Sequence, residues 1–413
     1  MFKKFIKKTI VLLFILFILP NLSVFANTEI DSDELSNLIL ETANSDLSNF
    51  PQITSRSYAI FDRNSRKLLF GKEENKKKKM ASTTKIMTAI VILENCKLQD
   101  IVTVSCNSAS TGGSVIGLKK NDKVTVENLL YGLLVCSGND AAVALAEHLC
   151  GSVEGFAKVM NQKATSLGLV NTNFITPHGL DADNHYTTAY ELALLTDYAL
   201  QNKTFAKIVS TKSITITINN YTKQIKNTNA LLGSLNGIYG VKTGFTNGAF
   251  KCLVTACKRE DLDIICVLLG ADTSQIRIKD TTKLLEYTFA NYKSVNLQEI
   301  VNSEFNNFVS NENKKNSIAI SKSQTTNLDL SVEELTSPIV PIKKTDIPNL
   351  KSFCCFSNKF EAPLPSKTYI GSIYITLDNT LIASSSIRLD NTISRKNLWN
   401  NFMILISNIG KFS

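Results

Sequence analysis

Two apolar, strand-like runs joined by a short charged turn constrain the fold of this chain most strongly. The runs cover residues 250–257 and 263–270, and four charged residues at 258–261 lie between them. A turn this short makes the two strands antiparallel neighbours. Segments 57–80 and 214–225 alternate in the same way, which predicts two further hairpins and hence an antiparallel sheet.

Segments with helical character lie between the first hairpin and the later ones. Strands and helices do not alternate regularly, so we expect one α/β (α+β) unit over 53–292 rather than a series of parallel βαβ units. The helices that we expect cover about 82–93, 123–135, 140–150, 187–200 and 274–292.

The length of 413 residues exceeds what one hydrophobic core usually supports, so we expect two domains. Residues 295–390 are rich in Asn, Ser and Lys and hold five of the eight prolines. Their short strand-like runs, including a hairpin around Asp378 and Asn379, predict a small all-β second domain. Residues 27–52 are polar and predict a leader with one short helix.

Residues 1–26 have the pattern of a secretory signal peptide. Four lysines precede an apolar run at 10–19, Pro20 ends the run, and small residues before the end of the segment predict cleavage after Ala26. A retained anchor is the alternative, but ten apolar residues are too few for a bilayer that needs about 20. Removing the four lysines lowers the formal net charge from +9 to +5, which suits a polyanionic wall or a membrane surface.

The tail 395–413 predicts an amphipathic helix that is too short to span a membrane. We expect it to lie at the membrane surface, because a Trp and a Phe are placed at the chain terminus. A helix packed on its own β-domain is the alternative. The apolar residues at helical spacing are Leu398, Trp399, Phe402, Met403, Ile406 and Ile409.

Composition argues against two classes of ligand. The lysine run 76–79 has no interleaved aromatic residues, so we expect no nucleic-acid partner. The chain has no C-x-x-C and only three histidines, so we expect no zinc site. Its nine cysteines cannot all pair, and we interpret most of them as buried thiols. A reducing or anaerobic habitat would fit that use of cysteine.

Three short motifs carry candidate chemistry, and the first is Ser82 with Lys85. Residues three apart on a helix share a face, so the lysine would lie beside the serine hydroxyl. Backbone N–H groups at a helix start can also stabilise an oxyanion. Lysine acts as a base only when burial or a second cation lowers its pKa. The alternative is that Ser82 is simply a helix N-cap.

The second motif, at 136–142, places Ser137 and Asn139 in a glycine-containing turn between two expected helices. The hydroxyl can relay a proton and the amide can bind a carbonyl, although a plain connection between helices is the alternative. The third, at 240–246, predicts the opening of a strand. There Lys242 supplies a cation, Thr243 a hydroxyl, and Gly244 lets a ligand approach the backbone, unless Lys242 is an ordinary surface lysine.

In this order, S-T-T-K, S-G-N and K-T-G resemble the motifs of penicillin-interacting serine enzymes. More closely, the chain resembles the low-molecular-mass penicillin-binding proteins, which are serine-type D-alanyl-D-alanine carboxypeptidases. The resemblance covers about residues 53–390. It rests on the segments 80–89, 133–147, 160–174, 176–193, 240–246 and 362–380.

The resemblance implies a serine β-lactamase/penicillin-binding-protein-like transpeptidase fold, with an antiparallel sheet and a helical subdomain, followed by the small all-β domain. It implies removal of the terminal D-alanine from peptidoglycan stem pentapeptides, inhibition by β-lactam antibiotics, and no metal or cofactor. The expected location is extracytoplasmic, at the outer face of the cytoplasmic membrane.

The resemblance also assigns roles to the matched residues. Ser82 is the acylated nucleophile, Lys85 its general base, and Ser137 the group that passes the proton to the leaving D-alanine. The backbone N–H groups of Ser82 and Phe245 form the oxyanion hole, although many members have His where this chain has Phe245. The substrate-binding residues are Asn139, Lys242, Thr243, Gly244 and Phe245.

Three alternatives share parts of this pattern. A β-lactamase needs a deacylating base, and the nearest candidate segment, which begins at Glu191, lacks the expected Asn. A D,D-endopeptidase that cuts cross-links uses the same chemistry. A catalytically silent peptidoglycan-binding protein would be favoured by the loss of Ser82 or Lys85, yet both are present. We interpret His178 and His185 as structural residues.

Overall fold

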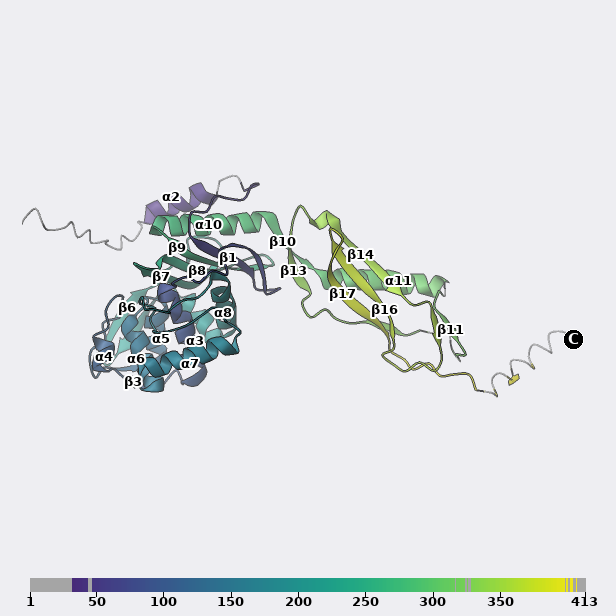
Figure 1. Ribbon diagram of the computed structural model, residues 1–413, viewed down its shortest axis with the longest axis horizontal. Coiled ribbons are helices and arrows are strands. Elements are labelled where there is room, and N and C mark those ends of the chain that lie inside the picture. The colour runs from purple at the N-terminus through teal and green to yellow at the C-terminus, as the bar shows by residue number, and fades with distance from the viewer. Residues whose placement is uncertain are drawn as a thin grey trace, which may run out of the picture.

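The computed structural model describes residues 32–43, 47–315, 317–323, 325, 328–397, 399, 402–403 and 406. The expected signal peptide at 1–26 lies outside these residues. Within them, an N-terminal domain and a C-terminal region lie end to end along the long axis of the molecule (Figure 1). No helix among the described residues is long and apolar enough to cross a membrane.

The N-terminal domain is built on a five-stranded sheet in the order β2-β1-β9-β8-β7, with every neighbouring pair antiparallel. The sheet is antiparallel, as predicted, and it joins the early hairpin to the late strands, whereas the hairpin predicted at 214–225 forms a separate two-stranded sheet. The strands are β1 (Ser57–Asp62), β2 (Lys67–Lys72), β7 (Ile238–Thr246), β8 (Phe250–Arg259) and β9 (Leu262–Ala271).

Strand β9 shows why its sequence is apolar without interruption. Ile265 and Val267 point into a core on one face of the sheet, whereas Ile264 and Cys266 point into a second core on the other face. Successive residues of a strand face opposite sides, so a strand covered on both sides must be apolar throughout.

Helices cover both faces of this sheet (Figure 1). The larger helical group packs on one face, and α2 and α10 pack on the other, where Leu35 and Ile39 of α2 are buried. The folded domain therefore begins before residue 53, because part of the expected leader is in its core. The helices are α2 (Ser32–Ala43), α3 (Lys85–Asn95), α4 (Cys106–Ala109), α5 (Val126–Leu134), α6 (Asn139–Cys150), α7 (Val153–Ser166), α8 (Ala189–Gln201), α9 (Lys203–Val209) and α10 (Ser274–Asn291).

Two of the expected helices begin differently. The 82–93 helix starts as a 3-10 turn, η1 (Ala81–Thr84), and the α-helix begins only at Lys85. The 123–135 helix starts as strand β4, after which the Thr125 side chain caps α5 by accepting from the Asn128 N–H. Two small two-stranded antiparallel sheets complete this domain: β3 (Ile101–Thr103) pairs with β4 (Lys123–Thr125), and β5 (Ser213–Ile218) pairs with β6 (Tyr221–Lys226) as a hairpin.

The C-terminal region has a four-stranded sheet in the order β12-β17-β16-β14, and the hairpin predicted around Asp378 and Asn379 joins β16 to β17. One face of the sheet packs on helix α11 (Leu297–Lys315), which the polar sequence did not predict. The strands and short helix are β10 (Tyr292–Asn296), β11 (Ala319–Ser321), β12 (Leu330–Val332), β13 (Ile339–Lys343), η2 (Ile347–Asn349), β14 (Leu350–Phe356), β15 (Lys359–Glu361), β16 (Tyr369–Leu377) and β17 (Thr380–Leu389).

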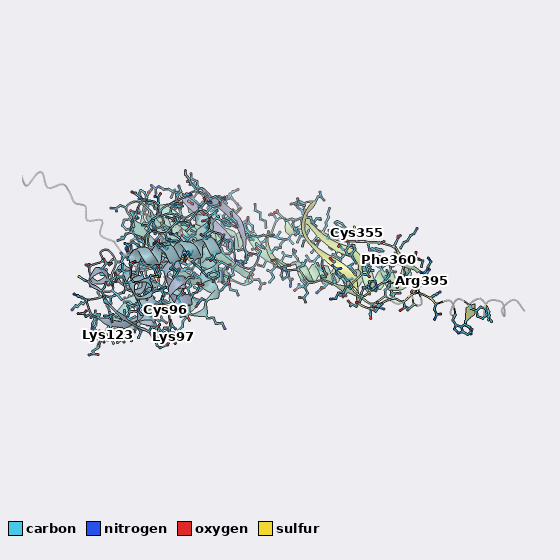
Figure 2. The ribbon with its side chains drawn as sticks, turned by 60° about the horizontal axis from the view of Figure 1, so that its bottom comes forward. Cys96, Lys97, Lys123, Cys355, Phe360 and Arg395 are labelled. Atoms are coloured by element: carbon cyan, nitrogen blue, oxygen red, sulfur yellow. The ribbon has the colours of Figure 1, made fainter. Side chains whose placement is uncertain are left out.

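All nine cysteines lie among the described residues, and each is a free thiol. Only Cys252, Cys257 and Cys266 are fully buried, so the expectation that most are buried is wrong. Burial raises the pKa of Cys252 to about 11. Figure 2 shows Cys96 in the N-terminal domain and Cys355, which is exposed, in the C-terminal region.

Candidate active site

The three motifs converge beside β7, the edge strand of the N-terminal sheet. The first motif, with Ser82 and Lys85, occupies η1 and the first residue of α3, and the second, with Asn139, occupies the turn between α5 and α6. The third, with Lys242, lies in the middle of β7 rather than at its start. A Cβ on Gly244 would lie 3.1 Å from the Ser82 backbone N and 3.1 Å from the Met80 carbonyl O. Glycine at this position therefore lets β7 lie against the backbone of Ser82.

Ser82 is not a helix N-cap. The residues that precede η1 and α3, Met80 and Thr84, make no side-chain cap hydrogen bond, and Ser82 lies inside the 3-10 turn. Thr83 and Thr84 hold this turn, because their hydroxyls donate to the Met80 and Ala81 carbonyls at 2.6 and 2.8 Å. The cap interpretation is therefore wrong, and the half-buried Ser82 hydroxyl is available to Lys85.

Lys85 is completely buried and has three oxygen atoms around its amine. Its Nζ lies 2.8 Å from Ser82 Oγ, 2.7 Å from Asn139 Oδ1 and 2.7 Å from the His178 carbonyl O. A neutral amine has two N–H bonds and one lone pair. Asn139 and His178 offer only acceptors, so they take the two N–H bonds and leave the lone pair directed at the Ser82 hydroxyl.

The surroundings of Lys85 favour this neutral form. Burial lowers its pKa well below the ordinary 10.5, and the positive charge of Lys242 lowers it further. Asp140 and Cys136 act in the opposite direction and raise it by a smaller amount. Desolvation and a nearby like charge are the two effects that make lysine a base near neutral pH.

Lys242 is itself completely buried, and burial lowers its pKa to about 7. Its Nζ donates to the Thr243 carbonyl at 3.0 Å, and the Thr243 hydroxyl is hydrogen-bonded to that of Thr228 at 2.6 Å. Phe245 is 42 % exposed, and Lys251 Nζ lies 3.7 Å from the centre of its ring. The aromatic residue therefore forms part of the rim of the site.

The turn between α5 and α6 contributes Ser137 and Asn139. Ser137 has a φ of +66°, a left-handed conformation that a non-glycine residue adopts at a cost in energy. The Asn139 amide is engaged at both ends, because its Nδ2 donates to the Gly112 carbonyl at 2.8 Å and its Oδ1 faces Lys85. In this structure the Asn139 side chain therefore orients Lys85.

Two groups at the site were missed in the sequence. The His178 carbonyl is a backbone acceptor, which no residue pattern reveals. Arg277 lies in the first turn of α10, and the positive charge of its guanidinium helps to lower the pKa of Lys242. Its Nε is buried without a hydrogen-bond partner among the described residues. A lone arginine in an ordinary helix start has no motif to mark it.

The two structural histidines are neutral at ordinary pH. Burial lowers the pKa of His185 to about 4, and its Nε2 lies 2.8 Å from the Thr84 hydroxyl. Burial, with the charge of Lys85, lowers the pKa of His178 to about 3. His178 Nδ1 accepts from the Leu180 N–H at 3.1 Å, so the ring holds the loop that presents its carbonyl to Lys85.

Comparison with known proteins identifies the family. The family model described as D-alanyl-D-alanine carboxypeptidase, Peptidase_S11, matches residues 42–273. The chain belongs to this family. The predicted resemblance, the fold class and the class of enzyme, a serine-type peptidase, are thereby confirmed, and the alternative functions are not favoured.

Individual relatives support the assignment over most of the chain. D-alanyl-D-alanine carboxypeptidase DacF of Bacillus subtilis is 32% identical over 339 residues, which cover 81% of this chain and 84% of the relative. The crystal structure of penicillin-binding protein 5 from Haemophilus influenzae matches with a TM-score of 0.66 at 29% identity, covering 84% of this chain and 99% of that one.

A third relative matches less of this chain. D-alanyl-D-alanine carboxypeptidase of Streptomyces sp. strain K15 is 37% identical over 244 residues, which cover 54% of this chain and 82% of the relative.

Proposed function

We propose that this carboxypeptidase removes the terminal D-alanine from peptidoglycan stem pentapeptides through an acyl-enzyme on Ser82. The observation that carries the proposal is the completely buried Lys85 amine, 2.8 Å from Ser82 Oγ, with both of its N–H bonds directed at other acceptors. Such an amine can accept the serine proton without leaving its place.

The reaction follows from this geometry. Lys85 takes the Ser82 proton as Oγ attacks the carbonyl carbon of the penultimate D-alanine. The backbone N–H groups of Ser82 and Phe245 stabilise the oxyanion that forms. Ser137 relays this proton from Lys85 to the nitrogen of the leaving D-alanine, the C–N bond breaks, an ester on Ser82 remains, and Lys85 is neutral again. Water then attacks this ester while Lys85 takes its proton; the ester C–O bond breaks, and the proton passes from Lys85 back to Ser82 Oγ.

The cations near β7 suit the free carboxylate of the substrate. Thr243 offers a hydroxyl, and Lys242 and Arg277 supply positive charge in a region from which water is largely excluded. A β-lactam presents a carboxylate and a reactive amide in the same order, so the same serine is expected to be acylated by penicillins. Both kinds of ligand are met outside the cytoplasm.

The test is a release assay with the purified protein. A peptide ending in D-Ala-D-Ala should yield one equivalent of free D-alanine, and benzylpenicillin should block the release. A cross-linked muropeptide dimer, supplied separately, should be cleaved much more slowly. Cleavage of the dimer without D-alanine release from the pentapeptide would contradict the proposal and indicate a D,D-endopeptidase. A folded protein that is inactive on both substrates would indicate a peptidoglycan-binding protein without catalytic activity.

We also propose that the tail 395–413 binds the membrane surface. Only Trp399, Phe402, Met403 and Ile406 of its helical part are described, and the four are helical and exposed, with Trp399 68 % exposed. These exposures favour the membrane over packing on the C-terminal sheet. The Trp399 and Phe402 rings lie 5.8 Å apart between centroids and form one apolar surface.

Substituting both aromatic residues, in the variant Trp399→Ser/Phe402→Ser, is expected to lower binding to phosphatidylglycerol vesicles about tenfold or more, because each buried ring contributes roughly 1.5–3 kcal/mol. Co-sedimentation with the vesicles measures the effect. The control is Val170→Ser, which removes an apolar side chain that is 82 % exposed on the N-terminal domain. Equal binding by both variants would refute a membrane role for the tail.

A further inference from the structure

A completely buried carboxylate outside the three motifs holds one wall of the site. Asp140, the second residue of α6, receives four backbone N–H groups. Its Oδ1 accepts from Ile116 at 3.0 Å and Ala141 at 2.9 Å, and its Oδ2 accepts from Gly117 at 2.8 Å and Leu118 at 3.0 Å. Three of these four donors belong to the loop 112–118, so one side chain determines the path of that loop.

The other end of the same loop is joined to Asn139. The Gly112 carbonyl accepts from Asn139 Nδ2 at 2.8 Å, and the Ser114 carbonyl accepts from the Asn139 backbone N–H at 2.7 Å. Between them Gly113 has a φ of +85°, and a Cβ there would lie 2.6 Å from Asn139 Nδ2. The loop and the Asn139 amide therefore fit together with no space between them.

We propose that Asp140 is a positioning residue for the general base Lys85: by anchoring the loop 112–118 it holds the Gly112 carbonyl against Asn139 Nδ2, which keeps Asn139 Oδ1 directed at Lys85. The inference rests on the proposed function, in which Lys85 is the base. Asp140 acts through Asn139 and does not touch the reacting atoms.

The orientation of the Asn139 amide decides whether Lys85 works. With Oδ1 toward Lys85, the amine donates to Asn139 and keeps its lone pair for Ser82. With the amide reversed, an NH2 group would face the amine and compete for that lone pair. The Gly112 carbonyl excludes the reversed form, because it would then face Oδ1, an acceptor. If the loop 112–118 were free to move, the Gly112 carbonyl would no longer favour one orientation of the Asn139 amide.

The charge of Asp140 adds an electrostatic effect of defined sign. It raises the pKa of Lys85, against the lowering by burial and by Lys242 on β7. The other titratable groups that interact with Lys85 are Cys136, before the α5–α6 turn, and His178, on the loop whose carbonyl the amine contacts. Loss of the Asp140 charge alone therefore moves the Lys85 pKa downward.

The test compares Asp140→Asn with the matched control Asp122→Asn. Asp122 is also a buried carboxylate that holds a turn, with its Oδ2 accepting from the Lys119 N–H at 2.7 Å and its Oδ1 from Asn219 Nδ2 at 2.5 Å, and no hydrogen bond among the described residues joins it to Asn139. We expect Asp140→Asn to slow acylation by fluorescent penicillin at least about tenfold. The acid limb of the pH–rate profile should move to lower pH, because Lys85 loses its proton more readily.

A third variant, Asp140→Glu, separates the two effects. Glutamate retains the negative charge, but its longer side chain places the carboxylate differently against the loop 112–118. The acid side of the pH–rate profile should therefore return toward the wild-type position, while the acylation rate stays low. If Asp140 only stabilised the fold, Asp140→Asn would lower the melting temperature and the fraction of active molecules. Its rate per active molecule and its pH profile would then match those of Asp122→Asn, and the inference would be wrong.

A second readout needs no activity. The pKa of Lys85 can be followed by NMR of lysine labelled with ¹³C at Cε, with the signal assigned through Lys85→Arg. We expect a lower Lys85 pKa in Asp140→Asn than in wild type, and an unchanged pKa in Asp122→Asn. A wild type that is never acylated would refute the proposed function, whereas an unshifted Lys85 pKa together with an unchanged acylation rate per active molecule in Asp140→Asn would refute the role of Asp140.

Discussion

Replacing Ser82 with alanine is expected to abolish both D-alanine release and covalent binding of benzylpenicillin. The substitution removes the only atom that the proposed reaction acylates. It should not disturb the fold, because the 3-10 turn around Ser82 is held by the Thr83 and Thr84 hydroxyls. The Lys85 amine also keeps its two other acceptors, Asn139 Oδ1 and the His178 carbonyl.

Intact-protein mass spectrometry after incubation with benzylpenicillin measures this effect directly. Wild type should gain the mass of one penicillin molecule, and Ser82→Ala should gain none. The control Ser110→Ala removes an exposed hydroxyl that donates to the Cys106 carbonyl at 2.8 Å, and it should be labelled like wild type. An adduct on Ser82→Ala would mean that another side chain is the nucleophile, and peptide mapping would locate it.

Local pattern was sufficient to predict the hairpins of the N-terminal domain and the antiparallel character of its sheet, but not the order of the strands. The β8–β9 hairpin was predictable because both strands are covered on both faces and are therefore apolar. Helix α11 was not, because its few buried residues, among them Leu297, Val301 and Phe308, are separated by polar ones in a segment rich in Asn and Lys. That helix depends on packing against the C-terminal sheet, and local sequence does not carry that information.

The active site also has a part that the sequence predicted and a part that it did not. The motifs identified Ser82, Lys85 and Lys242 as candidate site residues, because acyl transfer requires side chains of these types. They did not predict how Lys85 is oriented, since that depends on the His178 and Gly112 carbonyls, and every residue has a carbonyl. They also placed Ser82 at the start of an α-helix. In the structure Ser82 lies in a 3-10 turn that precedes the α-helix and is held by the Thr83 and Thr84 hydroxyls.

Replacing Lys85 with arginine is expected to slow acylation about a thousandfold, a typical loss for a general base. Arginine can donate to Asn139 and His178, but it does not lose its proton in proteins and so cannot accept the Ser82 proton. Wild-type acylation should fall as the pH drops below the lowered Lys85 pKa, because protonated lysine has no lone pair for the Ser82 proton. The residual activity of Lys85→Arg should lack this limb.

Stopped-flow acylation by a fluorescent penicillin between about pH 5 and 9 tests both parts of this prediction. The control is Lys223→Arg, which changes a lysine whose Nζ donates to the Ile116 carbonyl at 2.7 Å in the wall of the same site. A Lys85→Arg enzyme that stayed within tenfold of wild type and kept the acid limb would exclude Lys85 as the base. The limb would then belong to Lys242, the other buried lysine at the site, whose pKa is lowered to about 7.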